Sequence, residues 1–192
     1  MDYKPLDETT WSDFEQLFGK HKGVRGGCWC VYHRIPASLY NKTTREERYN
    51  LKRSFVKDDQ ATGIIVYESN EPVGWCNVGK AEYFVQFDRS VAYQEFMQTN
   101  TIKPEWRIAC VFVDKHHRKE GLSASVLACA MAYIQSQGGG LVEAFPLHVV
   151  NQNKPQYTGT LNQYLALGFE IITRLGKNRV LVRKQIKTSG SI

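Results

Sequence analysis

The stretch from Val113 to Ser125, VDKHHRKEGLSAS, gathers residue types that bind anions. Arg118 and Lys119 supply positive charge for charge-assisted hydrogen bonds. Gly121 has no side chain to hold a ligand away from the backbone, and Ser123 adds a small hydroxyl. If a helix begins here, its unpaired backbone N–H groups and its dipole also attract negative charge. This turn is therefore predicted to hold a phosphate or a pyrophosphate.

The sequence on either side predicts the elements that position this turn. Residues 106–113, WRIACVFV, form an apolar run typical of a buried strand. Residues 120–137 are typical of an apolar helix that ends in glycines, and LVEAFPL at 141–147 predicts the next strand. A strand, a helix and a second strand in this order predict a right-handed parallel crossover. The basic turn lies between the first strand and the helix.

The rest of the chain predicts further helices and antiparallel hairpins. Helices are expected at 8–21, 43–58, 89–98 and 158–168, a strand at 26–35, and hairpins at 63–81 and 169–185. Thr44 and Glu47 form a capping-box pattern at the start of the second helix. The turns of the hairpins are expected at residues 69–72 and 176–178. These patterns predict a mixed α/β fold with a mostly antiparallel sheet and one parallel crossover.

Composition narrows the class of protein. The chain has 192 residues, of which 42% are hydrophobic and 23% charged, the profile of a soluble globular protein. No apolar run reaches the ~18 residues of a membrane-spanning helix, and the N-terminus lacks the apolar core of a signal peptide. We therefore expect a cytoplasmic protein with no membrane partner. We expect one domain over residues 1–186 and a loose C-terminal tail at 187–192.

The net charge of +6 is dispersed along the chain, with small clusters only. A dispersed excess is typical of a solvated surface, so nucleic acid is the less favoured partner. The five cysteines are odd in number and match no common zinc spacing. Cys28 and Cys30 share a face if their segment is a strand, but two further ligands cannot be placed. Buried free thiols are therefore expected, and no metal.

Two motifs together resemble the GNAT superfamily of N-acetyltransferases. Arg118-x-x-Gly121-x-Ser123 after a buried strand resembles the family's Arg/Gln-x-x-Gly-x-Gly/Ala loop, with serine at the last small position. The stretch from Tyr164 to Phe169, YLALGF, resembles the family's closing Tyr-x-x-x-Gly-Phe signature. The predicted element order also matches the family over nearly the whole chain. The resemblance implies a GNAT acyl-coenzyme A N-acyltransferase fold, with helices on both faces of the sheet, and acetyl-coenzyme A as co-substrate.

The resemblance implies roles for individual residues. The strand before the turn separates from its neighbour at a bulge in this family, and its free edge pairs with the pantetheine arm. The turn itself wraps the pyrophosphate. Tyr164 matches the tyrosine that protonates the leaving thiolate, and Tyr157 can substitute for it. The residues implied to bind the cofactor are Cys110, Val111, Phe112, Val113, Arg118, Lys119, Glu120, Gly121, Leu122 and Ser123.

The general base and the acceptor site stay open on the sequence alone. Glu105 and Glu143 are the candidate bases, although Glu143 can instead pair with an arginine such as Arg107, and some family members need only water. An acyl intermediate on Cys110 requires an activated thiolate, and no activator lies near it in sequence. Direct transfer is therefore favoured. The aromatic residues of segment 80–105 can wall an acceptor pocket or cap the core: Tyr83, Phe84, Phe87 and Tyr93.

The leading hypothesis is an acetyl-coenzyme A-dependent N-acetyltransferase that acts on a primary amine of a small molecule. The alternative is a non-catalytic domain of the same fold that binds or senses acyl-coenzyme A and needs neither Tyr164 nor a base. A third class is a protein that binds nucleic acid or the ribosome through its basic surface. The strands of the terminal hairpin also allow a homodimer.

Overall fold

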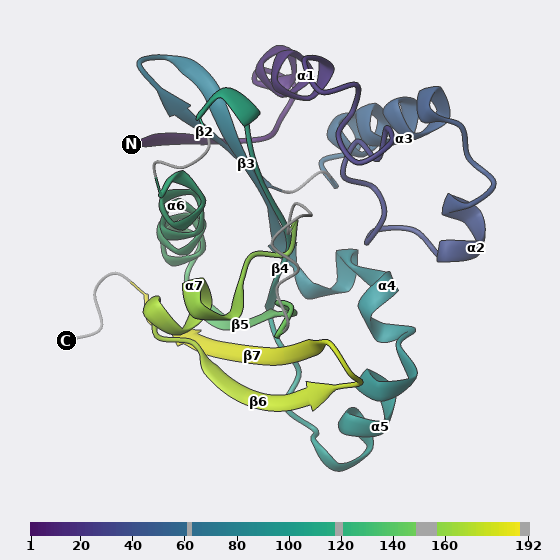
Figure 1. The fold of residues 1–192 in the computed structure, drawn as a ribbon, viewed down its shortest axis with the longest axis vertical. Helices are drawn as coiled ribbons and strands as arrows, with labels where there is room; N and C mark the ends of the chain where they lie inside the picture. The colour runs from purple at the N-terminus through teal and green to yellow at the C-terminus, as the bar shows by residue number, and fades with distance from the viewer. Residues whose placement is uncertain (61–62, 118–120, 149–156, 189–192) are drawn as a thin grey trace.

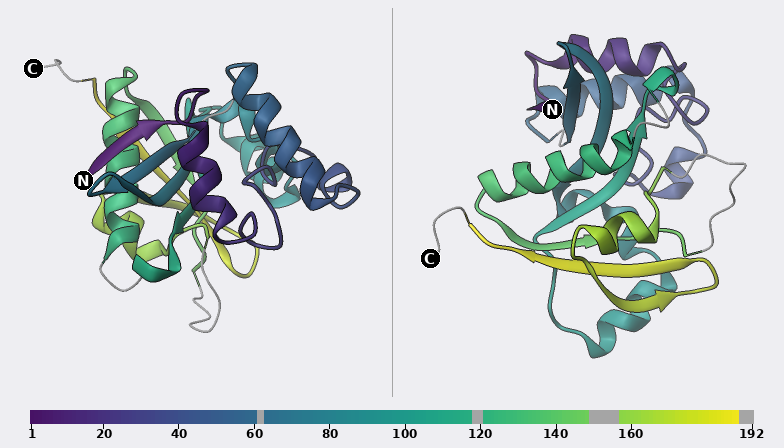
Figure 2. Two further views of the ribbon diagram at one scale, coloured as in Figure 1. Left: turned by 90° about the horizontal axis from the view of Figure 1, so that it is seen from above. Right: turned by 60° about the vertical axis from the view of Figure 1, so that its left-hand side comes forward.

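A computed structural model of the chain describes residues 1–60, 63–117, 121–148 and 157–188 (Figures 1 and 2). Its strands form one sheet in the order β1-β2-β3-β4-β5-β7-β6. The strands are β1 (Asp2–Pro5), β2 (Ile64–Glu68), β3 (Glu71–Lys80), β4 (Trp106–Val113), β5 (Gly140–Ala144), β6 (Glu170–Leu175) and β7 (Arg179–Ile186). β4 and β5 pair in parallel, and the other neighbours pair antiparallel. The predicted mixed α/β sheet with a parallel crossover is confirmed.

Helices cover both faces of this sheet, as Figure 2 shows. They are α1 (Trp11–Gly19), α2 (Ala37–Tyr40), α3 (Arg45–Lys57), α4 (Val85–Asp88), α5 (Val91–Thr99), α6 (Leu122–Ser136) and α7 (Leu161–Ala166). Side chains along β2 contribute to a separate core on each face of the sheet, because successive side chains of a strand point in opposite directions. Ile64 and Val66 belong to the core under α6 and α7, whereas Ile65 and Tyr67 belong to the core under α1 and α3.

The central helix α6 lies close to the sheet because β3 carries a glycine beneath it. A Cβ atom placed on Gly74 would lie 2.6 Å from Cγ2 of Val126, which is fully buried on α6. The absence of a side chain at this position therefore lets the helix approach β3. This packing fixes the start of α6, and with it the predicted anion-binding turn, against the strands that precede it.

The expected helices and hairpins are present, with shifts at their ends. The capping box of α3 is confirmed, because Thr44 N–H donates to Glu47 Oε2 over 2.6 Å and Glu47 N–H donates to Thr44 Oγ1 over 3.2 Å. The first hairpin turns at Ser69 and Asn70, which have φ of 48° and 67°. Glu71 already pairs with Glu68, so the turn is tighter than the predicted residues 69–72.

At the N-terminal end, one prediction is wrong and one strand is present that the sequence did not predict. Residues 26–35 form successive turns instead of a strand, and Trp29 and Cys30 have φ of 46° and 56°, which an extended strand excludes. Their alternating apolar pattern reflects a loop buried under α1 and α3. Strand β1 was not expected, because four residues with a lysine and a proline carry too little periodicity. Of the predicted loose tail, 189–192 lie outside the described residues.

Candidate active site at the split between two parallel strands

The sheet divides between β4 and β5. The two strands pair from Trp106 to Ile108 on β4, which lie opposite residues 142–144 on β5. On its other side, β4 pairs with β3 through Ile108 and then through Cys110, so Ala109 is an extra residue in the ladder. Such a bulge bends a strand and increases its twist. From here β4 continues to Val113 without β5 beside it, which leaves one backbone edge available.

One backbone donor on this edge is already engaged. Val111 N–H donates to the carbonyl oxygen of Tyr157 over 2.6 Å, and the Tyr157 side chain lies beside Cys110 at the same place. The edge from Cys110 to Val113 is the segment that the family resemblance assigns to the pantetheine arm. A ligand that pairs with Val111 N–H has to replace the bond to Tyr157.

The start of α6 leaves backbone donors open. Gly121 caps the helix with φ of 70°, and a Cβ atom placed on it would meet nothing within 4 Å. Among the described residues, none accepts a hydrogen bond from the N–H groups of Leu122 and Ser123. The Leu122 side chain is buried in the core and anchors the helix, so these amides are held in place. This arrangement suits a bound anion.

Ser123 also belongs to the predicted anion-binding turn. Ser123 Oγ accepts a hydrogen bond from Gln163 Nε2 over 2.5 Å, which ties α6 to α7. The hydroxyl can still donate to a ligand, since a hydroxyl both donates and accepts. Arg118, Lys119 and Glu120 lie outside the described residues.

Tyr164 lies in the core between α7 and the sheet. Its side chain is fully buried, and its hydroxyl donates to the Thr158 carbonyl oxygen over 3.1 Å. A Cβ atom on Gly159, whose φ is 73°, would lie 2.8 Å from the ring, so this glycine makes room for the tyrosine. Burial raises the pKa of Tyr164 well above its ordinary value, and the phenol stays protonated. A raised pKa makes the phenol a weaker acid than an ordinary tyrosine, and its role as general acid stays a prediction.

Glu143 does not face a cleft, in contrast to the prediction of a general base there. Its carboxylate is fully buried between two guanidinium groups: Arg107 Nε donates over 3.2 Å and Arg183 Nη2 donates over 2.8 Å. Tyr93 also donates to it over 2.9 Å. The alternative pairing with Arg107 is the one observed. A carboxylate with this many donors has no lone pair directed at a substrate.

Glu105 also lies away from the split. It precedes β4, at the end of the strand opposite the bulge. Its Oε2 accepts a hydrogen bond from Leu141 N–H over 2.6 Å, which joins β4 to β5. The prediction of Glu105 as a general base therefore has no support in the geometry.

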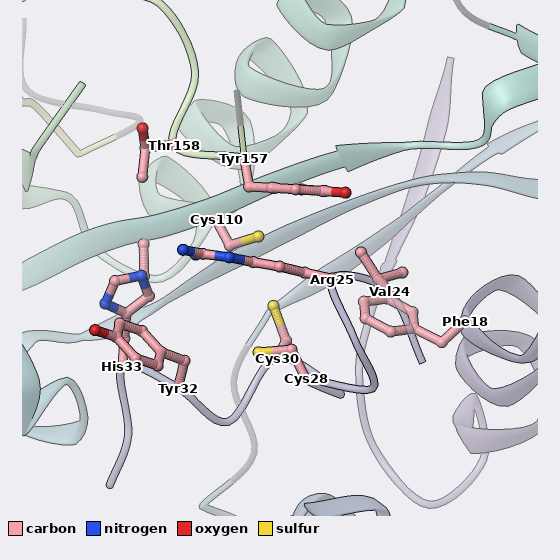
Figure 3. Close-up of a pocket in the computed structure, with 11 residues that line it drawn as sticks. Phe18, Val24, Arg25, Cys28, Cys30, Tyr32, His33, Cys110, Tyr157 and Thr158 are labelled. Carbon is pink, nitrogen blue, oxygen red and sulfur yellow. The ribbon is translucent and has the colours of Figure 1, made fainter. Parts of the chain in front are cut away.

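A narrow cavity opens at the bulge, between β4 and the loop that follows α1 (Figure 3). Its volume of about 20 Å³ is enough for one water molecule. It is lined by Phe18, Val24, Arg25, Cys28, Cys30, Tyr32, His33, Ala109, Cys110, Tyr157 and Thr158. Figure 3 shows Arg25 reaching across the cavity between Cys110 and Cys30. Most of these residues come from segment 18–33. The sequence pattern predicts a strand over 26–35, and this prediction hides the role of the loop.

Backbone strain is concentrated in this loop. Val24, Arg25 and Cys30 have φ of 58°, 42° and 56°, a region that non-glycine residues adopt at a cost. All three line the cavity. Such conformations persist where the surrounding structure imposes them, and they cluster at functional sites. The strain therefore supports a functional assignment for the loop.

The cysteines around the cavity are free thiols, as expected. Cys30 Sγ accepts a hydrogen bond from Trp75 Nε1 over 3.2 Å. Burial opposes its thiolate, but the Cys110 thiol and the charge of Lys52 outweigh burial and lower the pKa of Cys30. The pKa of Cys110 is raised well above its ordinary value by its interaction with Cys30 and by burial. Cys110 is therefore a protonated thiol, which agrees with direct transfer.

A wider cavity adjoins the narrow one and shares Tyr32 and His33 with it. Its volume is about 430 Å³, which suits a small molecule. His33 stacks on Phe87 with ring centroids 4.5 Å apart, and Phe87 stacks on Phe145 at 4.1 Å. Of the four aromatic residues that could wall an acceptor pocket, Phe87 lines this cavity. Phe84 and Tyr93 are buried in the core beneath α4 and α5, and Tyr83 packs against it.

Within the described part of the chain, no group of three or more histidine, cysteine or acidic side chains could hold a metal ion. The helices seen there are all too short or too polar to cross a lipid bilayer.

Comparison with known proteins gives a family and a fold. The sequence model of the acetyltransferase (GNAT) family matches residues 29–169. A search of curated proteins finds no matching relative. Among solved structures, an acetyltransferase assigned to the GNAT family from Desulfovibrio desulfuricans has a TM-score of 0.54 at 14% identity, and the alignment covers 96% of this chain and 99% of the other.

Two further structures are similar to the same extent. A phosphinothricin acetyltransferase from Sinorhizobium meliloti, in complex with acetyl-coenzyme A, has a TM-score of 0.52 at 12% identity, covering 100% of this chain and 93% of the other. A ribosomal-protein-alanine N-acetyltransferase from Brucella melitensis has a TM-score of 0.52 at 12% identity, covering 96% and 99%. At these identities the likeness establishes the fold, over nearly the full length of each chain.

Proposed function

The chain belongs to the acetyltransferase (GNAT) family, and from that premise we propose that it is an acetyl-coenzyme A-dependent N-acetyltransferase acting on the primary amine of a small molecule. The observation that carries the proposal is the split between β4 and β5, which lies next to the open N-terminus of α6. A cytoplasmic location is part of the proposal, since the chain's composition suits that compartment.

The residues at the split fit the cofactor. The N–H groups of Leu122 and Ser123 can hold a diphosphate, because no described residue accepts from them, and the open space at Gly121 leaves room for it. The edge from Cys110 to Val113 offers backbone groups to the pantetheine arm, which displaces Tyr157 from Val111. Acetyl-coenzyme A supplies an activated acyl group when bound. Backbone donors fixed in a dry site stabilise the charge that develops on a carbonyl oxygen.

His33, Tyr32 and Tyr164 have further roles in the proposed reaction. His33 and Tyr32 lie where the two cavities meet, so an amine in the wide cavity reaches the bulge past them. Tyr164 holds the proton that a leaving thiolate requires, and its hydroxyl contacts the Thr158 carbonyl at the cavity wall. Among the described residues no carboxylate lines either cavity. The amine therefore loses its proton to water, one of the routes that the sequence leaves open.

That absence of a carboxylate among the described lining residues also favours the second candidate, a domain that binds acyl-coenzyme A without transferring the acyl group. A thiol-release assay with a panel of amines separates the two. Release of coenzyme A that depends on an amine supports the enzyme. Coenzyme binding without release across the panel supports the sensor.

The proposed diphosphate site at the start of α6 is tested with Gly121→Glu. The new carboxylate lies at the helix N-terminus and repels a diphosphate, so coenzyme A should no longer raise the melting temperature. In the native protein, a ligand at 100 times its Kd adds ~2.7 kcal/mol of stability, which corresponds to a rise of several degrees. Differential scanning fluorimetry with and without coenzyme A measures the shift.

The matched control for this test is Gly176→Glu. Gly176 has φ of 69° and the same open space, but it lies in the turn between β6 and β7. This variant carries the same added charge and the same backbone strain, and it should keep the full shift. An equal shift in both variants would contradict the assignment of the diphosphate to α6.

A further inference from the structure

We propose that the acceptor amine carries an anionic group, a carboxylate or a phosphate, which Arg179 and Arg89 receive in the wide cavity beside the narrow one. This inference rests on the proposed acetyltransferase function, and it narrows the class of acceptor. Its support comes from the charges that line the cavity and from the position of His33.

The cavity is basic and, among the described residues, contains no compensating acid. Arg89 and Arg179 line it, and Arg25 reaches the adjoining narrow cavity. Within the described ranges, no carboxylate lies within 4.0 Å of any of these three guanidinium groups. In contrast, the buried Arg107 and Arg183 both pair with Glu143. The cavities therefore gather arginines that a ligand can neutralise.

Arg179 is the central residue of this group. It is half-buried, and its Nη1 donates to the Phe145 carbonyl oxygen over 3.2 Å, which holds the guanidinium against the cavity wall. Burial, together with the charge of Arg25, lowers the pKa of Arg179. A partly desolvated cation without a counter-ion is unfavourable, and an anion bound here relieves that penalty. A guanidinium also pairs with carboxylate or phosphate through two parallel hydrogen bonds.

His33 gives the acceptor its orientation. It is 7% exposed and lines both cavities, and its Nδ1 has no hydrogen-bond partner among the described residues. Burial and the charges of Arg179 and Arg25 lower its pKa to about 3, so the imidazole is neutral at physiological pH. A neutral imidazole can accept an N–H from the amine without adding a positive charge. The amine then lies at His33 toward the bulge, and the anionic group lies among the arginines.

The wall between these two ends is apolar. The stacked rings of His33, Phe87 and Phe145 form a continuous surface along the wide cavity. This surface suits the carbon skeleton that links an amine to its acidic group. The acceptor class that fits all three features is a small amino acid or an amine that carries a phosphate.

The experiment compares amines that differ only in the anionic group. The pairs are phenylalanine with phenethylamine, leucine with isoamylamine, and phosphoethanolamine with ethanolamine. A thiol-release assay with acetyl-coenzyme A gives kcat/KM for each. We expect the anionic member of at least one pair to exceed its neutral partner by ~10-fold or more, as a bidentate ion pair allows. The carboxylate and phosphate pairs show which group is preferred.

Arg179→Gln tests the residue itself. It should lower kcat/KM for the anionic amine by ~10-fold, mainly through KM, and leave the neutral amine within ~2-fold. Arg179→Lys keeps the charge and should recover part of the loss. The control is Arg174→Gln, because Arg174 is exposed on β6, interacts with His148 and lines neither cavity. The melting temperature of each variant, with and without coenzyme A, shows whether it is folded and binds cofactor.

The outcomes separate this inference from the proposed function. Turnover of neutral amines at rates equal to or above those of their anionic partners, in a protein that binds coenzyme A, overturns the anionic acceptor alone. Loss of the coenzyme shift overturns the proposed function. If coenzyme A binds and no amine turns over, N-acetylphenylalanine and N-acetylphenethylamine replace the amines in a binding assay. Stabilisation by the first product only, lost in Arg179→Gln, supports the inference, and equal or no stabilisation overturns it.

Discussion

At the scale of single residues, Lys52 is unusual because its amino group is fully buried and forms no hydrogen bond within the described part of the chain. Its Nζ lies over the rings of Trp75 and Phe14, 4.8 Å and 5.3 Å from their centroids, and it has no hydrogen-bond partner among the described residues. Burial, followed by the charge of Arg34, lowers the pKa of Lys52 from 10.5 to about 7. Its ammonium is thus lost in the folded protein at a pH where the unfolded chain still carries it.

Replacing this lysine should stabilise the protein in a pH-dependent way. Between pH 7 and 10.5 the unfolded state binds more protons than the folded state, so Lys52 becomes less unfavourable as the pH rises. Lys52→Met should therefore raise the free energy of unfolding at pH 6 by up to ~5 kcal/mol, and by less at pH 9. Urea unfolding at the two pH values measures it, with the exposed Lys57→Met on the same helix as control. An equal effect of Lys52→Met at both pH values would contradict the lowered pKa.

At the scale of elements, the carboxylate of Glu143 joins three strands to a helix. It lies on β5 and pairs with Arg107 on β4 and Arg183 on β7, while Tyr93 of α5 donates to it. Arg107 in turn pairs with Asp88 at the end of α4. The group thus holds the crossover strands, the closing hairpin and the helical segment 85–99 together. The sequence suggested a catalytic role for Glu143 because its apolar neighbours indicate burial. Burial is expected both for a general base and for a structural ion pair, so the sequence does not separate the two roles.

Glu143→Gln should destabilise the fold without removing catalytic chemistry. Removing one member of a buried ion pair leaves uncompensated charge and typically costs ~3–5 kcal/mol. The matched change Asp88→Asn removes a partner that is about half exposed, and should cost ~1 kcal/mol or less. Thermal and urea unfolding give both values. Under conditions where the Glu143→Gln variant is folded, its kcat should stay within ~10-fold of the native value, because loss of a general base costs ~100-fold or more.

At the scale of the whole molecule, the sheet ends at β6, whose outer edge is unpaired among the described strands. Ile171 and Ile172 on this strand are 52% and 38% exposed. An open edge with apolar side chains is a surface on which another chain can add. The homodimer suggested by the terminal hairpin stays a prediction, and this edge is where we expect the two copies to meet.

If the two copies meet at the edge of β6, a charge placed on this edge should lower the mass of the protein in solution from that of a dimer to that of a monomer. Light scattering coupled to size-exclusion chromatography should show a dimer for the native protein and a monomer for Ile171→Lys, because a charge on the edge strand opposes pairing. Val91→Lys is the control, since Val91 is 67% exposed on α5, away from the edge. A native protein that elutes as a monomer, or a variant that stays dimeric, would rule out this edge as the interface.

Much of the fold is predictable because its signals are local. The capping box at Thr44, the apolar run of β4, and the glycines that end α6 act within a few residues of one another. The same holds for Gly121, since a left-handed residue before a helix depends on backbone sterics alone. These local signals are therefore sufficient to identify the crossover and the turn before α6 from the sequence, while anion binding by this turn stays a prediction.

Local patterns in the chain establish the order of the strands from β2 onward, the crossover and the turn before α6. Tertiary packing decides which residues the loop after α1 contacts, and which charged side chains become buried or paired. Arg25 and His33 lie on this loop, whereas Arg179 lies far from them in the chain, so they come together only when the loop folds over β4 beside the closing hairpin. Periodicity reports local geometry, whereas pairing and desolvation of charges depend on distances across the folded protein, so Glu143 and His33 can be assigned only from their neighbours in space.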